Sequence, residues 1–185
     1  MAILPVTLYG DKILRNKAKK LTEITPKDLQ LIKNMFETMN NAYGIGLAAN
    51  QVGSNKSIFV VDLSPLEDYK DEKPRIFINP QIIEFSQEKV AHEEGCLSIP
   101  DVRAEVLRPK SIKIKFKNIS FEDCEIEAAE MLSRVIQHEY DHLKGIFFTD
   151  KIDPETQKKI TPELNKIKKR KIEIDYPVTE KPVEK

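Results

Sequence analysis

The chain has 185 residues, which is enough for one domain with its own buried core. Its 30 basic and 30 acidic side chains cancel, so the chain as a whole is not a polycation built for nucleic acid, and specific DNA binding is not expected. A hydrophobic fraction of 40% and a charged fraction of 32% indicate a soluble globular protein.

The start of the chain does not resemble a secretion signal, because its short apolar run is interrupted by Pro5 and no basic residue precedes it. Nowhere does an apolar run approach the roughly 20 residues that a membrane span needs. Only two cysteines are present, Cys96 and Cys124, and they do not indicate a disulfide framework. We therefore expect a cytoplasmic protein with no membrane partner.

The first predicted helix begins at Thr25, where a hydroxyl can cap the helix and a proline follows at the first helical position. Leu29, Ile32, Phe36 and Met39 then recur at helical spacing and form one apolar stripe. This pattern predicts a surface helix that covers the core and ends between residues 40 and 44.

Strand signals dominate from residue 47 to residue 128. The runs 57–62 and 75–80 are rich in β-forming residues, and a charged loop, 63–74, separates them. Residues 112–117 alternate strictly, so that isoleucines and a phenylalanine face one side and lysines face the other. Alternation of this kind is typical of an antiparallel sheet with one wet face.

A second helix is predicted from about residue 127 to residue 144, closed by Gly145, and its apolar residues on more than one side place it in the centre. Asp153–Pro154 and Thr161–Pro162 each look like a helix start, which predicts a third helix or a broken pair. We expect an α+β fold in which antiparallel sheets pack around the second helix, with one helix at each end of the chain. Residues 1–172 form the single domain, and 173–185 form a flexible charged tail.

The central helix carries the sequence QHEYDHLKG, residues 137–145. His138 and His142 lie one turn apart and can bind one metal ion, while Glu139 lies about 100° round the helix, beside the ion. Two ordinary histidines are the plain alternative, but burying three such polar side chains without a shared role would cost several kcal/mol.

A catalytic ion needs a third protein ligand and an open position. Zinc proteases with HExxH take that ligand from downstream, where one class would need a histidine in place of Phe148 and another would use a glutamate such as Glu163. Upstream, EEGCLSIP (93–100) offers Cys96, which as a thiolate could reach a metal from a tight turn, or could be a small buried hydrophobe.

Three segments together resemble the three signature motifs of the peptide deformylase family: GIGLAANQVG (44–53), EEGCLSIP (93–100) and QHEYDHLKG (137–145). Residues 9–21 also look like this family, so the resemblance covers roughly residues 4–150. Enzymes of this family remove the formyl group from the N-terminal formylmethionine of new polypeptides. The resemblance thus implies a metal-dependent hydrolase that releases formate.

The resemblance also implies a role for individual residues. Cys96, His138 and His142 would hold a divalent metal ion, Fe(II) natively, with zinc, nickel or cobalt as substitutes. Glu139 would exchange protons with the reacting water, and the Gln51 side-chain amide and the Leu97 backbone N–H would bind the oxyanion.

The glycine-rich first motif has a physical reason of its own, since residues without a Cβ let backbone approach a ligand closely. An extended peptide could add there as a strand. Met131, Arg134 and Val135 precede His138 by one and two turns and would line a methionine pocket, although Arg134 could equally face solvent. The expected substrate-binding residues are Gly44, Ile45, Gly46, Gly95, Met131, Arg134 and Val135.

The implied partner is the N-terminal formyl-Met of nascent polypeptides. The basic segment Lys158 to Lys171 is a candidate contact to the ribosome, with a solvated helix face as the plain alternative. Two other functions stay open from the residues alone. They are an HExxH zinc peptidase and a non-catalytic metal-containing peptide-binding protein.

Overall fold

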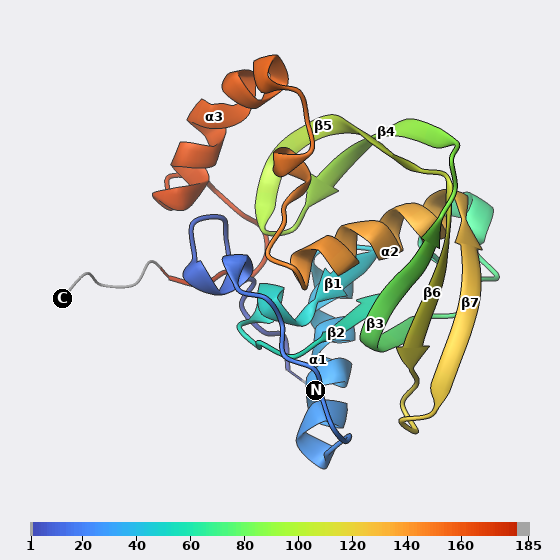
Figure 1. Cartoon of the computed structure of the whole chain (residues 1–185). Coiled ribbons are helices and arrows are strands. Elements are labelled where there is room, and N and C mark those ends of the chain that lie inside the picture. The colour runs from blue at the N-terminus through green and yellow to red at the C-terminus, as the bar shows by residue number, and fades with distance from the viewer. Residues whose placement is uncertain (1, 181–185) are drawn as a thin grey trace.

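A five-stranded antiparallel sheet forms the larger layer of the structure, a computed structural model that describes residues 2–180 (Figure 1). Its strand order is β1-β2-β3-β6-β7, so β1 and β7 are the two edges. The strands are β1 Gly46–Ala48, β2 Ile58–Val61, β3 Arg75–Phe85, β6 Ser111–Lys117 and β7 Asp123–Ala129.

The predicted alternation along β6 is confirmed. Ile112 and Ile114 are buried, and Phe116 is partly buried and packs against the same core. On the opposite face, Lys113 lies 3.0 Å from Glu125 of β7 across the antiparallel pair. At the β6–β7 end, one face of the sheet therefore packs on the core and the other faces water.

The second sheet is a hairpin of β4 (Lys89–Cys96) and β5 (Ile99–Pro109), joined by the two-residue turn Leu97–Ser98. Along β5, every second residue from Val102 to Arg108 is buried. The hairpin thus turns one face toward the rest of the protein.

Helix α2 (Glu130–His142) lies between the five-stranded sheet and the hairpin, as Figure 1 shows. Nine of its 13 residues are buried, which confirms the prediction of a central helix. It begins three residues later than expected, because residues 127–129 still pair with β6. Gly145 follows the helix in a left-handed conformation with φ +74°, and a Cβ there would lie 2.4 Å from the backbone oxygen of Arg15.

Helix α1 (Pro26–Asn41) begins at the predicted cap, where the Thr25 hydroxyl accepts a hydrogen bond from the Asp28 N–H, and the Asp28 carboxylate accepts one from the Thr25 N–H. Ile32 and Met39 are buried against β1 and β2, together with Met35. The helix covers this core from one side, as its apolar stripe predicts.

Helix α3 (Pro154–Lys168) is one continuous helix with Pro162 inside it. Of the two predicted forms, a third helix and a broken pair of helices, the first is therefore correct. Proline removes the N–H that would bond to Lys158, but that residue is exposed, so water can pair with its carbonyl. Leu164 and Ile167 pack against β5.

The segment after α3 differs from the expected flexible tail. Residues 176–179 dock on the N-terminal segment, where the Val6 N–H donates to the Pro177 carbonyl at 2.8 Å. The last part of the expected tail, 181–185, lies outside the described residues.

Among residues 2–180, no helix is both long and apolar enough to cross a membrane. The α+β class and the central HExxH helix are confirmed.

Candidate active site

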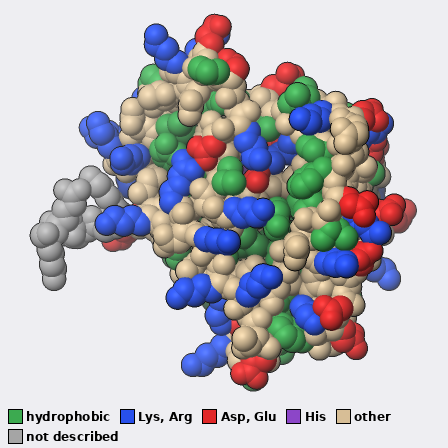
Figure 2. Space-filling view, viewed as in Figure 1, with side chains coloured by type: hydrophobic (Ala, Val, Ile, Leu, Met, Phe, Trp, Pro, Cys, Tyr) green, Lys and Arg blue, Asp and Glu red, His purple; other side chains and the backbone are tan. Residues whose placement is uncertain are grey.

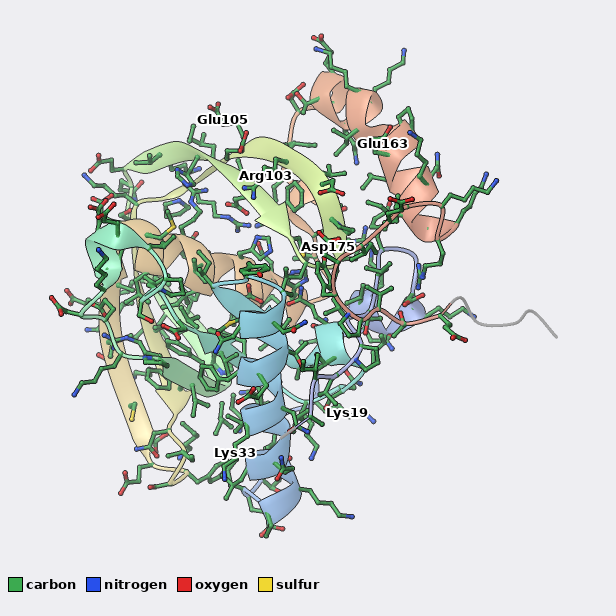
Figure 3. The ribbon with its side chains drawn as sticks, turned by 180° about the vertical axis from the view of Figure 1, so that it is seen from behind. Lys19, Lys33, Arg103, Glu105, Glu163 and Asp175 are labelled. Atoms are coloured by element: carbon green, nitrogen blue, oxygen red, sulfur yellow. The ribbon has the colours of Figure 1, made fainter. Side chains whose placement is uncertain are left out.

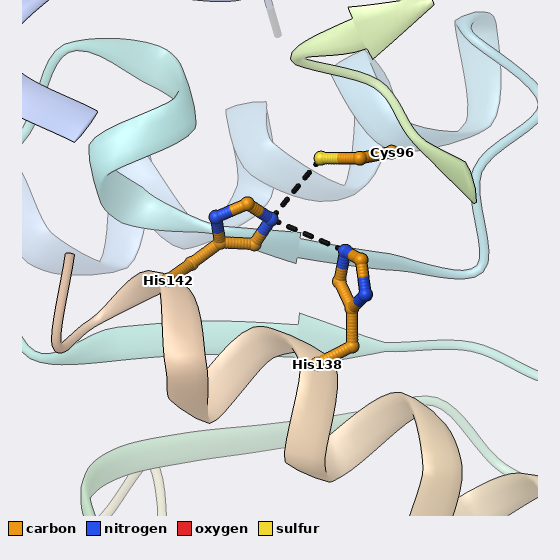
Figure 4. Close-up of side chains that lie close together, drawn as sticks. All are labelled: Cys96, His138 and His142. Atoms are coloured by element: carbon orange, nitrogen blue, oxygen red, sulfur yellow. Dashed lines mark hydrogen bonds between the residues drawn. The ribbon is translucent and has the colours of Figure 1, made fainter. Parts of the chain in front are cut away.

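Three side chains with metal-binding atoms meet between α2 and the end of β4 (Figure 4). The Nε2 atoms of His138 and His142 are 3.2 Å apart, as expected for histidines one helical turn apart. The Cys96 Sγ lies 3.1 Å from Nε2 of His142. The structure therefore brings together the cysteine and the two histidines that the sequence analysis selected.

The geometry fits a divalent metal ion. Metal–nitrogen and metal–sulfur bonds of about 2.0–2.3 Å in a tetrahedral site place the ligand atoms about 3.3–3.6 Å apart, close to the observed spacings. Burial also keeps the pKa of His142 well below its ordinary value. The ring is therefore neutral, which is the form in which imidazole binds a metal.

A buried carboxylate orients the first histidine. Glu94 is 5% exposed, and its Oε2 lies 2.9 Å from Nδ1 of His138. In the neutral ring, a hydrogen bond from Nδ1–H to this oxygen leaves Nε2 available to bind a metal, on the side of Cys96 and His142. Burial alone would raise the pKa of Glu94, but hydrogen bonds from Arg108 and His138 outweigh it and hold the pKa well below its ordinary value.

Two arginines neutralise this carboxylate. Arg108 donates from Nε and Nη2 to the two oxygens of Glu94 at 2.6 and 2.9 Å, and Arg134 donates to Oε1 at 2.9 Å. Arg108 also donates to Asp141 of α2 at 2.6 Å. We call Glu94, Arg108, Arg134 and Asp141 the buried ionic network. It ties the hairpin to the metal-ligand helix.

Arg134 is placed differently from both sequence-based alternatives. Its side chain lines the cleft, but it is only 8% exposed and its guanidinium turns inward instead of reaching the rim. Besides Glu94, the guanidinium contacts the backbone carbonyls of Val90 and Val106, at 2.6 and 2.9 Å. The solvent-facing alternative is wrong, because these acceptors hold the charge inside.

Glu139 lies beside the ligand group and is 4% exposed. Within the described part of the chain, its Oε2 has no hydrogen-bond partner. Burial raises the pKa of Glu139 to about 7. A carboxylate whose pKa lies near neutrality, with one oxygen unpaired, is suited to accept and return a proton.

Gly46 makes room for this carboxylate. A Cβ at residue 46 would lie 2.5 Å from Oε1 of Glu139 and 2.8 Å from Val135. Strand β1 can therefore approach α2 this closely only if the residue has no side chain.

The Gln51 side chain is fixed in direction. Its Oε1 accepts a hydrogen bond from the Ala48 N–H at 2.8 Å, so the Nε2 group points the other way. Nε2 lies 3.2 Å from Ser98 Oγ and 3.4 Å from Cys96 Sγ. The amide donor thus faces the turn that carries Leu97.

An open cleft of about 530 Å³ gives access to this group. The glycine-rich first motif lines one side, the end of β4 lines another, and α2 contributes the floor. With the exception of His142, every residue proposed from the sequence lines the cleft: Gly44, Ile45, Gly46, Gln51, Gly95, Cys96, Leu97, Met131, Arg134, Val135, His138 and Glu139.

The downstream ligand candidates lie elsewhere. Phe148 is buried, with its ring centroid 6.1 Å from that of His138, and offers no ligand atom. Glu163 lies on the exposed side of α3, paired with Lys166 at 2.8 Å, and Figure 3 shows it far from α2. Neither could complete the site of a zinc protease.

Three residues of the site were not predicted from the sequence: Glu94 and Arg108 behind His138, and Tyr176, which lines the cleft from the C-terminal segment. A signal for Arg108 exists in the sequence, since it continues the buried series Val102, Ala104, Val106 at a spacing of two. No local pattern marks Tyr176.

Fold and site together define a hydrolase of the HExxH type whose ligand group includes a cysteine from the preceding hairpin. The family model described as polypeptide deformylase matches residues 3–158. The chain belongs to the polypeptide deformylase family of enzymes. The expectation from the three motifs is confirmed.

Relatives and solved structures agree with this assignment. The chain is 46% identical over 178 residues to the peptide deformylase of Prosthecochloris aestuarii, covering 96% of this chain and 95% of the relative. A crystal structure of peptide deformylase from Ehrlichia chaffeensis matches with a TM-score of 0.82 at 33% identity, covering 92% of this chain and 97% of that one. A plant peptide deformylase PDF1B structure matches with a TM-score of 0.85 at 36% identity, covering 91% and 90%.

Proposed function

We propose that this protein hydrolyses the N-formyl group from the formylmethionine of newly made polypeptides in the cytoplasm, releasing formate. The observation that carries the proposal is the buried Oε2 of Glu139, which has no hydrogen-bond partner among residues 2–180 and lies beside the cysteine and histidine group on the cleft. Membership of the polypeptide deformylase family supports the choice of substrate.

Cys96, His138 and His142 would hold the metal ion, which we propose to be Fe(II), with zinc, nickel or cobalt as substitutes. When bound, the ion would supply Lewis acidity to the reacting water and the formyl group. The chain's part is to hold both imidazoles in the direction that the metal needs. Glu94 does this for His138.

Glu139 is the proposed general base and acid. Its carboxylate would take a proton from water as the water attacks the formyl carbon, and would then give that proton to the departing α-amine. Both steps need an oxygen that no protein group already occupies, as is found for Oε2 among residues 2–180.

The negative charge that develops on the formyl oxygen needs donors fixed in advance. We assign this role to the Nε2 of Gln51 and the backbone N–H of Leu97. The bond from Ala48 supports the first assignment, because it leaves the amide of Gln51 only one direction in which to donate.

The backbone of the substrate would bind as an added strand. β1 is an edge strand, and the cleft separates its first residue, Gly46, and the two residues before it from Gly95 of β4. Backbone pairing accepts almost any sequence after the first residue. Met131, Val135 and the aliphatic stem of Arg134 would then contact the methionine side chain.

A pair of matched peptides tests the proposal. Protein purified without oxygen should release formate and a free amine from a formyl-Met tripeptide, and should leave the acetyl-Met peptide intact. Acetyl adds one methyl group at the carbon that we place between Glu139 and Gln51, so a site built for a formyl group should reject it. Cleavage inside both peptides, with no formate released, would point to a peptidase instead.

We further propose that the basic segment Lys158 to Lys171, in and just after α3, contacts ribosomal RNA near emerging chains. Figure 2 shows basic side chains, with acidic ones among them, over the part of the surface where α3 lies. Lys158, Lys169 and Lys171 are exposed there, and clustered positive charge is attracted to phosphate.

Changing Lys158, Lys169 and Lys171 to glutamate should reduce co-sedimentation with ribosomes at low salt. The control is the same charge change at three exposed lysines outside this segment, Lys17 between η1 (Lys12–Arg15) and α1, and Lys27 and Lys33 in α1. Equal loss in both variants would show that only net charge matters, and unchanged binding in both would end the proposal.

A further inference from the structure

The turn between β4 and β5 is held by hydrogen bonds from three separate segments. The Tyr9 N–H donates to the Ser98 carbonyl at 2.8 Å, and Gln51 donates to the Ser98 hydroxyl at 3.2 Å. The Tyr176 hydroxyl donates to the Leu97 carbonyl at 2.7 Å. The turn that carries a proposed oxyanion donor is thus fixed from outside the hairpin.

Two of these segments form one unit, which we call the terminal strap and define as residues 6–9 and 176–179. The Val6 N–H donates to the Pro177 carbonyl, and the Thr179 N–H donates back to the Val6 carbonyl at 2.9 Å, so the two segments form one parallel β-bridge. Thr7, also in the strap, donates its N–H to the Gln51 carbonyl of the first motif at 2.7 Å. The strap therefore bonds to both residues that supply oxyanion donors.

The C-terminal half of the strap is anchored by a partly buried ion pair. Arg170 donates to Asp11 Oδ1 at 2.7 Å, and both side chains are 15% exposed. The Thr179 hydroxyl donates to the other Asp11 oxygen at 2.7 Å, and Arg170 donates to the Thr179 carbonyl at 3.0 Å. Figure 3 shows Asp175, the residue before Tyr176, on the chain that returns from α3 toward the turn end of the hairpin.

We propose that Tyr176 is a positioning residue for the deformylase reaction, setting the direction of the Leu97 N–H through its bond to the Leu97 carbonyl. This inference rests on the proposed function. The carbonyl and the N–H of one residue are linked by its own two backbone dihedrals, so holding the carbonyl restricts the N–H. Tyr176 also lines the cleft, and it lies outside the residues 3–158 that the family model matches.

Tyr176 is suited to this role because its hydroxyl remains a donor. Burial, together with the charges of Cys96 and Asp101, raises the pKa of Tyr176 above its ordinary value, so the phenol keeps its proton over the working range. A simple packing role would need only the ring.

The test removes the hydroxyl and keeps the ring, in Tyr176→Phe. The full-length protein is assayed for formate release from a formyl-Met peptide, and hydrogen exchange is followed over residues 95–99. We expect kcat to fall about 3- to 10-fold with KM within about twofold of wild type, as for the loss of one hydrogen bond. Exchange in the turn should rise several-fold. The matched control is Tyr69→Phe, a partly buried tyrosine of η3 (Glu67–Tyr69) outside this cleft, which should change neither quantity.

The outcomes are distinct. Unchanged kcat and unchanged exchange in Tyr176→Phe would overturn the inference while leaving the deformylase proposal intact. A rise in KM alone would also overturn it, because Tyr176 would then act in peptide binding. If wild type released no formate, the proposed function would fail, and Tyr176 would have no reaction to position.

Discussion

Replacing Glu139 by glutamine is expected to lower kcat for the formyl-Met peptide by about 10²- to 10⁴-fold, the usual contribution of a general acid or base. Glutamine has nearly the same shape, so the cleft should keep its form. Its amide cannot accept a proton from water, and the oxygen that has no partner among residues 2–180 is the one that would do so. Steady-state kinetics together with the metal content of the same preparation measure the effect.

The same substitution should not lower the free energy of unfolding. Glu139 is buried, and burial raises the pKa of its carboxyl because the charged form is poorly solvated there. A neutral side chain removes that cost, so thermal unfolding should occur at the same temperature or higher. The control is Glu130→Gln at the exposed start of α2, which should change neither rate nor stability. A Glu139→Gln protein with wild-type kcat and full metal content would refute the assigned role.

Elements set by local chemistry were predictable from the sequence. The Thr25 cap with its proline places the start of α1, and strict alternation assigns the faces of β6. The start of α2 was not predictable in this way. Residues 127–129 could extend a helix, but they pair with β6 as the end of a strand. Pairing partners that lie far apart in sequence decide such boundaries.

The site residues also divide into those that local sequence predicts and those that it does not. Ligand candidates lie within short motifs whose spacing has a chemical reason, whereas the groups that support them depend on tertiary contacts. Arg108 meets Asp141 across 33 residues, and Tyr176 meets Leu97 across 79. A prolonged alternation marks Arg108 as inward-facing, and a buried arginine requires an acidic partner, but nothing local says which acid.

The buried ionic network behind His138 gives the second large effect. Glu94→Gln should lower the free energy of unfolding by about 3 kcal/mol, since removing one partner of a buried pair leaves the other charge uncompensated. Among residues 2–180, Arg134 would then have no acidic partner, and Arg108 would keep one, Asp141. For a chain of this size the midpoint of thermal unfolding should fall by about 6–12 °C.

Metal affinity should fall as well, by about 10- to 100-fold, because the amide no longer fixes which nitrogen of His138 carries the proton. Titration with a chelator and thermal unfolding measure the two effects on one preparation. Glu93→Gln is the matched control, because Glu93 is the neighbouring residue, its side chain is 65% exposed, and its nearest cation, Arg103, lies 3.9 Å away. That variant should stay within about 0.5 kcal/mol of wild type. If the two variants lost metal equally, the loss would reflect charge near the cleft, and Glu94 would have no special role in orienting His138.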